Sequence, residues 1–281
     1  MIYYVRPIRL LWVVKIMLFK GYHAQPVGRV SSRHLTLSIL LFISINHGAL
    51  ADKVSVAVAS NALKALQSIK SEFEKHTPHQ LLISSGSTGK LYAQIINGAP
   101  YDVFLAANVS DPRHLEEKDV IVKNSRFTYA KGRLALCSTT LLLDETTATQ
   151  YLTTGKFTRL ALANPKTAPY GKASKEVLQK IKAWESNKRK FIKGENISQA
   201  YQFTASGNAQ MGFVALAQIW NNQTSGLKKC WQIPENYHSV LEQQAVWLKR
   251  AENNPAAKAF IEYIKSVQVK KILRRDFGYG I

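Results

Sequence analysis

Short β-rich runs alternate with amphipathic helical stretches along most of the chain, and this alternation limits the possible folds more than any other feature. Residues 54–59 (VSVAVA) are a run of small and β-branched residues typical of a buried strand. Downstream, Ala62, Leu66, Ile69 and Phe73 recur at helical spacing on one face. The same order of strand and helix returns several times. It predicts an α/β protein with parallel strands.

The remaining elements follow from similar patterns. Further strands are predicted at residues 81–84, 101–107, 133–137, 159–163 and 211–216. Helices are predicted from Lys90 to a stop at Gly98, after Gly171 with Ala173, Val177, Ile181 and Trp184 on one side, from Ile197, and from Pro255 with Phe260, Ile261 and Ile264 facing inward. Asn61 and Asn254 occupy expected helix N-cap positions, and Pro255 suits the first position of its helix.

Residues 1–51 differ from the rest of the chain. They hold six basic residues and no Asp or Glu, and they end in an apolar run (35–44) followed by Ala49-Leu-Ala51. A basic start, a short apolar centre and a small-residue ending are the parts of a secretory signal peptide. The run is short for a membrane span, so we expect cleavage near Ala51 and export to the periplasm. The residue directly after Ala51 is Asp and not Cys, which argues against a lipid anchor there.

The charge balance narrows the possible partners. Six of 38 basic residues and none of the 18 acidic ones lie in the leader, so residues 52–281 carry a formal charge of +14. Nucleic acid, an anionic membrane or a small anionic ligand would each suit such a chain. The export signal argues against nucleic acid. Much of the positive charge falls between Lys172 and Lys193, where a solvated helix face accounts for it.

Two cysteines, Cys137 and Cys230, lie in the predicted exported part. They would be able to pair in an oxidising compartment, but two unpaired buried thiols fit the sequence equally well, because it gives no distance between them. Neither has a metal-ligand spacing. His76 and His79 are close enough to share a metal, yet the intervening Thr77-Pro78 predicts a solvated turn.

Small, uncharged polar residues gather where predicted strands give way to helices. They are Ser60-Asn61, Ser85-Gly-Ser-Thr88 and Ala168-Pro-Tyr-Gly171. In open α/β sheets, ligands bind beyond the carboxyl ends of the strands. Helix N-termini there offer unpaired N–H groups and a positive dipole end, and hydroxyl and amide side chains add neutral donors. Each junction alone fits an ordinary helix cap, but together they predict a site for an anion.

These segments resemble the periplasmic molybdate-binding proteins of ABC transporters, in the type II solute-binding family. The resemblance runs in order over nearly all of residues 53–281. It is carried by VSVAVASN (54–61), SSGSTGKLYAQI (84–95), NGAPYDVFLAA (97–107), NPKTAPYG (164–171), QMGFVAL (210–216) and DFGY (276–279).

The resemblance implies two α/β lobes with mixed sheets, joined by a two-strand hinge, with the ligand cleft between them. The leader would cover residues 1–51, lobe I residues 52–131 and 248–281, and lobe II residues 132–247. It also implies a monomeric, non-enzymatic protein without a cofactor, which delivers molybdate or tungstate to a membrane permease. The implied ligand contacts are Ser60, Asn61, Ser87, Thr88, Tyr170 and a backbone contact at Ile197.

Two positions depart from the family pattern. Many members have Ser where this chain has Asn61, and many have Tyr where it has Ala215. Tyr170 is then expected to supply the missing hydroxyl contact. Molybdate carries two negative charges and no proton, so a site made of donors alone satisfies it, whereas protonated phosphate needs an acceptor.

Other functions fit less well. Residues 84–91 approach a phosphate loop, but Ser84 and Leu91 occupy the positions of its first Gly and last Ser/Thr. A serine hydrolase would need a GxSxG elbow, which is missing. The alternatives that remain open are a binding protein for sulfate or phosphate and a basic exported module for anionic polymers or membranes.

Overall fold

A computed structural model describes residues 52–221, 226–227 and 230–281, so the predicted leader lies outside the described residues. The first of two five-stranded sheets has the order β2-β1-β3-β10-β4. Strand β1 pairs in parallel with β2 and β3, while β10 pairs antiparallel with β3 and β4. Its strands are β1 (Lys53–Ala59), β2 (Gln80–Gly86), β3 (Val103–Leu105), β4 (Phe127–Gly132) and β10 (Leu241–Trp247).

The second sheet repeats this plan in the order β7-β6-β8-β5-β9. Strand β6 pairs in parallel with β7 and β8, while β5 pairs antiparallel with β8 and β9. Its strands are β5 (Leu134–Cys137), β6 (Leu160–Ala163), β7 (Phe191–Gly194), β8 (Met211–Ala215) and β9 (Trp231–Gln232). The predicted fold class, with two mixed α/β sheets, is confirmed.

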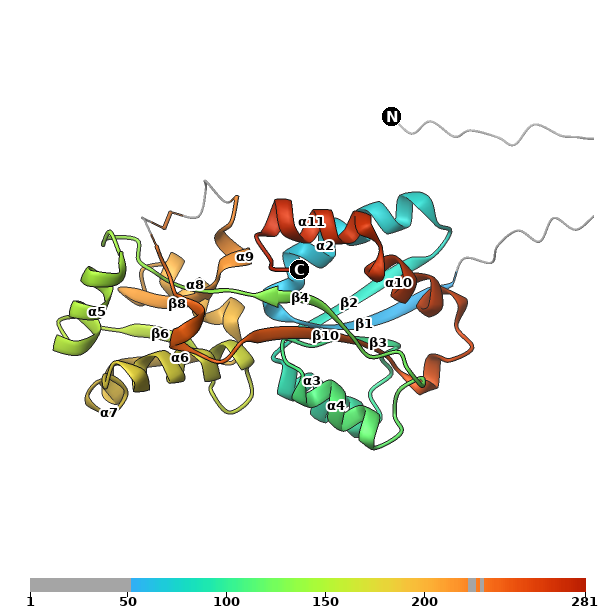
Figure 1. Ribbon diagram of the computed structural model, residues 1–281, viewed down its shortest axis with the longest axis horizontal. Coiled ribbons are helices and arrows are strands. Elements are labelled where there is room, and N and C mark those ends of the chain that lie inside the picture. The colour runs from blue at the N-terminus through green and yellow to red at the C-terminus, as the bar shows by residue number, and fades with distance from the viewer. Residues whose placement is uncertain (1–51, 222–225, 228–229) are drawn as a thin grey trace, which may run out of the picture. The chain divides into compact units, whose positions relative to one another are not determined.

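The chain passes between the two sheets twice. It leaves the first sheet at the end of β4 and enters the second at β5 after a single residue, and it returns between β9 and β10. Figure 1 shows β4 and β10 side by side, running from the β1–β3 side toward the β6 and β8 side. These paired strands are the predicted two-strand hinge, and we call the parts around the first and second sheets lobe I and lobe II.

Helices cover both sheets. In lobe I they are η1 (Ser60–Ala62), α2 (Leu63–His76), α3 (Thr88–Ile96), α4 (Ser110–Glu117), η4 (Lys249–Ala251), α10 (Pro255–Lys265) and α11 (Val267–Phe277). In lobe II they are α5 (Glu145–Thr154), α6 (Pro169–Lys180), α7 (Trp184–Asn187), η2 (Lys188–Lys190), α8 (Ile197–Ala205), α9 (Leu216–Ile219) and η3 (Glu235–Tyr237). None of the helices in the described residues is long and apolar enough to cross a bilayer.

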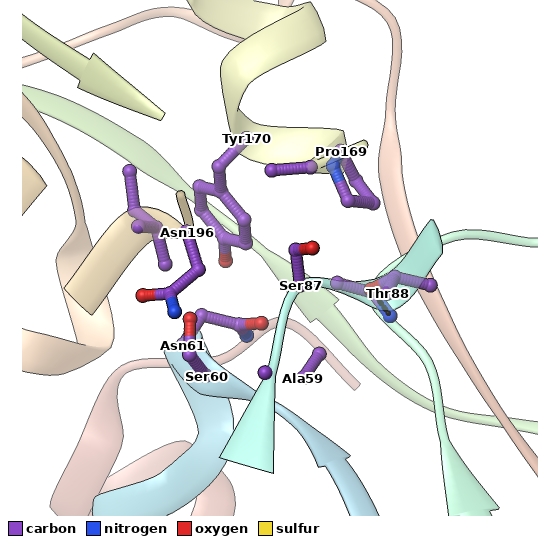
Figure 2. A pocket seen from close by; sticks show the side chains of 12 residues that line it. Ala59, Ser60, Asn61, Ser87, Thr88, Pro169, Tyr170 and Asn196 are labelled. Atoms are coloured by element: carbon purple, nitrogen blue, oxygen red, sulfur yellow. Dashed lines mark hydrogen bonds between the residues drawn. The ribbon is translucent and has the colours of Figure 1, made fainter. Parts of the chain in front are cut away.

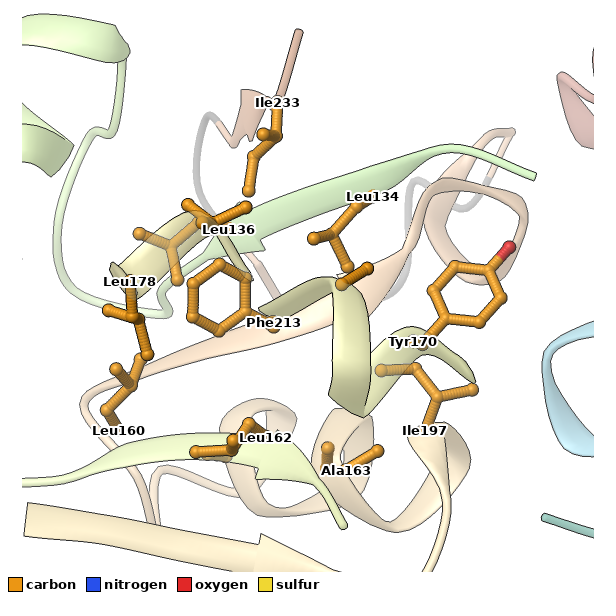
Figure 3. Close-up of a cluster of buried hydrophobic side chains, with 14 of the residues drawn as sticks. Leu134, Leu136, Leu160, Leu162, Ala163, Tyr170, Leu178, Ile197, Phe213 and Ile233 are labelled. Atoms are coloured by element: carbon orange, nitrogen blue, oxygen red, sulfur yellow. The ribbon is translucent and has the colours of Figure 1, made fainter. Parts of the chain in front are cut away.

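The sequence patterns account for most of these elements. The predicted face of α2 is buried at Ala65, Leu66, Ile69 and Phe73. At α10 the Asn254 side chain accepts hydrogen bonds from two backbone N–H groups of the first turn, with Pro at the first position, as predicted. In lobe II, apolar residues of β5, β6 and β8 pack against α6 in one buried core (Figure 3).

Three local predictions are wrong. Asn61 is not a helix cap, since α2 begins after Ala62 and the Asn61 side chain bonds elsewhere. The helix expected to run through Trp184 stops at Lys180, and the chain turns at Lys182 with a φ of 58° before α7 begins. The strand expected at 101–107 shortens to β3, whose residues 103–105 are in register with β1 and β10, and only Asp102 and Ala106 beside it make further backbone hydrogen bonds to those strands.

Cys137 and Cys230 form a disulfide, which decides the alternative that the sequence left open. The bond ties the end of β5 to the segment that leads into β9. Disulfides persist mainly in oxidising compartments, so the bond agrees with export.

Candidate functional site

A small cavity lies between the two lobes, where the carboxyl ends of parallel strands meet helix N-termini. The space between its lining residues measures about 180 Å³, part of it open to solvent. Pockets for drug-sized ligands commonly measure roughly 300–1,000 Å³, so this cavity suits a small ion better than a metabolite. Its lining residues are Ala59, Ser60, Asn61, Gly86, Ser87, Thr88, Ala107, Ala168, Pro169, Tyr170, Asn196 and Ile197.

The structure brings all six sequence-predicted site residues to this cavity (Figure 2). Lobe I contributes Ser60 and Asn61 from the end of β1, and Ser87 and Thr88 from the end of β2. Lobe II contributes Tyr170 and Ile197 from the first turns of α6 and α8. Residues more than 130 positions apart in sequence therefore line the same cavity.

Ser87 is the most informative of these residues. Its side chain is buried, and its Oγ has no hydrogen-bond partner among the described residues. Ser87 precedes α3, yet it makes no capping bond. A buried hydroxyl without a partner costs about 1–3 kcal/mol, so native proteins rarely keep one without a use. The neighbouring Thr88 Oγ1 accepts from the Ala107 N–H at 3.1 Å, which leaves its own proton available.

At the start of α8, the Asn196 side chain accepts from the N–H groups of Ser198 and Gln199. The first N–H groups of a helix have no partner within it. The N–H groups of Ser198 and Gln199 bond to Asn196, so the N–H of Ile197 is left in this turn to donate into the cavity.

Tyr170 enters the cavity from α6, which begins at Pro169. Burial raises the pKa of the Tyr170 hydroxyl well above its ordinary value, and the nearby Tyr279 and Tyr129 add to the rise. The polar side chains of Gln243, which donates to this hydroxyl, and of Asn61 oppose the rise but do not cancel it. The hydroxyl therefore keeps its proton at physiological pH and can act as a donor.

Behind Asn61 lies a buried group of hydrogen-bonded side chains that we call the tyrosine–amide cluster: Asn61, Tyr129, Tyr170, Gln243 and Tyr279. The Asn61 amide nitrogen donates to Gln243 Oε1 at 3.0 Å and to the Tyr279 hydroxyl at 3.1 Å. Tyr129 also donates to Gln243 Oε1, at 2.9 Å, and Gln243 Nε2 donates to the Tyr170 hydroxyl at 3.3 Å.

Sequence reasoning missed Tyr129, Gln243 and Tyr279. Gln243 stands in the strand LEQQAVW (241–247) and is fully buried. A Gln inside a buried strand is a signal that could have been used, because a buried amide needs partners. Local patterns do not indicate which partners those are.

The cavity lining holds no charged side chain. Within the described ranges, no three His, Cys, Asp or Glu residues cluster closely enough to hold a metal ion. His76 is the last residue of α2, where the chain was expected to turn at the surface. Ala215 belongs to the buried strand β8 and does not line the cavity. The chemistry available to a ligand is therefore neutral hydrogen-bond donation.

Three contacts join the lobes at the cavity rim. The Gly89 N–H donates to the Thr167 carbonyl at 2.9 Å, and the Ser198 hydroxyl donates to the Ser60 carbonyl at 3.1 Å. Lys90 and Glu195 form an ion pair at 3.0 Å. The lobes meet around the cavity in this structure.

Comparisons with known proteins agree with this architecture. The profile of the bacterial extracellular solute-binding proteins matches residues 54–280. Molybdate-binding protein ModA of Azotobacter vinelandii is 42% identical over 83% of this chain and 92% of its own length. The Rhodobacter capsulatus ModA is 36% identical over 86% and 94%.

Among solved structures, the periplasmic molybdate-binding protein of Azotobacter vinelandii superposes with a TM-score of 0.76. The two are 35% identical, over 81% of this chain and 99% of that one.

Proposed function

This chain belongs to the bacterial extracellular solute-binding proteins and, within them, to the molybdate-binding ModA family, and from that premise we propose that it captures molybdate or tungstate. The ion is held as an intact dianion by neutral donors in the cavity between the lobes. The observation that carries the proposal is the buried, unpartnered hydroxyl of Ser87 in a cavity lined without charge.

Each site residue has a distinct role in this proposal. The hydroxyls of Ser60, Ser87, Thr88 and Tyr170 donate to the oxyanion, as does the backbone N–H of Ile197. Asn61 contributes through its backbone N–H, because both protons of its side-chain amide are used by Gln243 and Tyr279. Of the two hydroxyls at the start of α3, Ser87 has no hydrogen-bond partner among the described residues, and Thr88 accepts from the Ala107 N–H and keeps its own proton for the ligand.

Donor-only chemistry selects among tetrahedral oxyanions. Molybdate, tungstate and sulfate carry no proton at neutral pH, so each can accept a hydrogen bond from every donor. Phosphate that keeps a proton would bring a donor into a wall of donors, and one buried pair would go unsatisfied. Sulfate has the same charge and hydrogen-bonding character, so selection against it must rest on size, through the longer metal–oxygen bonds of molybdate and tungstate.

The biological setting follows from the family. We propose that the leader directs export, that cleavage near Ala51 releases the chain into the periplasm, and that a monomer delivers the ion to the permease of an ABC transporter. No catalysis and no cofactor enter this role. We place the first division of the lobes between β4 and β5, near the predicted boundary of 131. We place the second between β9 and β10, ahead of the predicted boundary of 247, because β10 pairs with β3 and β4 of the first sheet.

Calorimetry and thermal unfolding of the mature chain test the proposal. A ligand present at about 100 times its dissociation constant stabilises the folded state by roughly 2.7 kcal/mol. Molybdate and tungstate should each raise Tm and release or absorb heat, with sulfate and phosphate well behind. If heparin or anionic vesicles raise Tm and no oxyanion does, the proposal is wrong. The protein would then be an exported module that binds anionic polymers or membranes.

A further inference from the structure

The hydrogen bonds of the tyrosine–amide cluster fix which group donates and which accepts in each pair, and with that the role of the Tyr170 hydroxyl at the cavity. The starting point is Tyr279, whose hydroxyl donates to the backbone carbonyl of Asn61 at 3.1 Å. A hydroxyl has one proton, so the Tyr279 oxygen must accept its second contact, from the Asn61 side chain. The nitrogen end of the Asn61 amide therefore points toward Tyr279.

Gln243 is fixed in turn. The same Asn61 nitrogen lies 3.0 Å from Gln243, so the atom facing it must be the Gln243 oxygen, an acceptor. Tyr129 donates to that oxygen as well. The Gln243 nitrogen then faces the Tyr170 hydroxyl at 3.3 Å and can only donate to it. The Tyr170 oxygen is an acceptor toward the hinge, and its own proton must point elsewhere.

Gly132 keeps these two groups in contact. It ends β4, and a Cβ on it would lie 2.2 Å from the Tyr170 hydroxyl oxygen and 2.5 Å from Gln243 Nε2. A side chain at this position would separate Tyr170 from Gln243. Glycine at position 132 therefore leaves room for the hydrogen bond between Tyr170 and Gln243, and a larger residue would not.

We infer that Gln243 is a positioning residue for ligand recognition, which turns the Tyr170 hydroxyl proton into the cavity by donating to the Tyr170 oxygen from behind. The inference rests on the proposed oxyanion function. It extends the binding site to a hinge residue outside the cavity lining, and it gives the chain a built-in preference for ligands that accept at this point. Figure 2 shows the Tyr170 hydroxyl directed toward the part of the cavity where Ser60 and Asn61 lie.

A double-mutant cycle tests the inference. Molybdate affinity is measured by calorimetry for the wild type, Gln243→Met, Tyr170→Phe and the double variant, with circular dichroism as the check on folding. Tyr170→Phe should weaken binding roughly tenfold to a hundredfold, as expected for a hydrogen bond to a charged ligand. Gln243→Met should weaken it about fivefold to tenfold, because the freed hydroxyl rotates away from the ion part of the time.

The combination decides the outcome. If Gln243 acts through Tyr170, the double variant binds no more weakly than Tyr170→Phe alone. Multiplication of the two losses would overturn the inference, because a general structural role does not depend on the Tyr170 hydroxyl. Gln244→Met is the matched control. Gln244 is the next residue of β10 and bonds with Arg126 and Thr128 instead, so affinity should not change.

A second variant keeps the test decisive if Gln243→Met does not fold. Gln243→Glu preserves the acceptor for Asn61 and Tyr129 but, once ionised, accepts the Tyr170 proton instead of donating. The negative charge of Gln243→Glu would also repel the dianion directly, and that repulsion would be the same in the Tyr170→Phe background. Only the part of the affinity loss that disappears in that background therefore supports the inference. A wild type that binds no oxyanion refutes the proposed function itself, whereas a wild type that binds molybdate with an additive cycle refutes only the role of Gln243.

Discussion

Two neighbouring regions of this protein bury polar side chains, the cavity between the lobes and the tyrosine–amide cluster behind it. In the cluster, Gln243 is fully buried and Tyr279 almost fully. Both side chains make hydrogen bonds to other members of the cluster. In the cavity, Ser87 is equally buried and its hydroxyl has no partner among the described residues. Paired groups of this kind stabilise the fold, whereas an unpaired one is a cost that a ligand removes.

The contrast separates stability from affinity at residues only a few ångströms apart. Substitutions in the cluster should lower the free energy of unfolding whether or not a ligand is present. Substitutions of unpaired cavity groups should lower ligand affinity and leave the empty protein as stable as before.

Alkaline pH should produce the largest effect, chiefly through the three buried tyrosines of the cluster. Burial raises the pKa of Tyr129, Tyr170 and Tyr279 above the ordinary tyrosine value. In the unfolded chain these hydroxyls ionise near pH 10, while the folded protein retains their protons. Their stabilisation is therefore complete below pH 10 and is lost as the pH rises through the folded pKa values, at about 1.4 kcal/mol per pH unit for each tyrosine and about 4 for all three.

Urea unfolding at pH 9, 10 and 11 measures this loss. Tyr129→Phe should reduce the slope above pH 10 by about one third, since one of the three buried hydroxyls is gone. Tyr92→Phe, a substitution on α3 outside the cluster, is the control and should leave the slope unchanged. Equal stability at pH 9 and 11 would show that the cluster is not sealed from solvent.

Asn61→Ala should give the next largest effect, because Asn61 belongs to both regions. Its amide bonds to Gln243 and Tyr279, and it also lines the cavity. Loss of these buried bonds should lower the free energy of unfolding by about 3 kcal/mol. Molybdate affinity should fall less, because alanine keeps the backbone N–H proposed as the donor and only the support of Gln243 and Tyr279 is lost. Chemical unfolding and calorimetry on the same preparation measure both. Weakened binding at unchanged stability would mean that Asn61 acts as a ligand donor only.

The two regions also differ in how far the sequence predicts them. Five of the six cavity residues lie in the polar junctions that local patterns single out, at the ends of β1 and β2 and at the start of α6, where parallel strands meet helices. Ile197, at the start of α8, is expected only from the family resemblance. The partners of Asn61 do not follow from local patterns. Gln243 and Tyr279 lie 182 and 218 positions away in sequence, and only the hinge and the C-terminal segment bring them close.

The same reasoning explains why Asn61 looked like a helix cap. Asn is a favoured cap residue, and an amphipathic helix follows it. A capping bond is local and can be read from the sequence, whereas the distant amide and hydroxyl partners that bind Asn61 instead cannot. Local patterns therefore predicted which residues reach the cavity but not which of their atoms remain available to a ligand.

Ser87→Ala sharpens the comparison from the cavity side. It removes a buried hydroxyl without a partner, so the unfolding free energy of the empty protein should stay within about 0.5 kcal/mol of wild type or rise. Molybdate affinity should fall by roughly 2 kcal/mol, or about thirtyfold, through loss of a bond to a charged ligand. Ser186→Ala, on the surface helix α7, is the control. A destabilised empty protein with normal affinity would assign Ser87 to the scaffold.

The smallest effect should come from the rim, where Lys90 and Glu195 join the lobes across the cavity. Both side chains are about half exposed, at 49% and 50%, and exposed ion pairs contribute about 0–1 kcal/mol. Glu195→Gln should therefore weaken molybdate binding less than about fivefold, and the difference from wild type should shrink as salt is added. Glu185→Gln removes an ion pair with Lys188 inside lobe II and should leave affinity unchanged. Calorimetry at two salt concentrations measures both variants. A loss for Glu195→Gln as large as that for Ser87→Ala would mean that contact between the lobes, and not donation to the ion, supplies most of the binding energy.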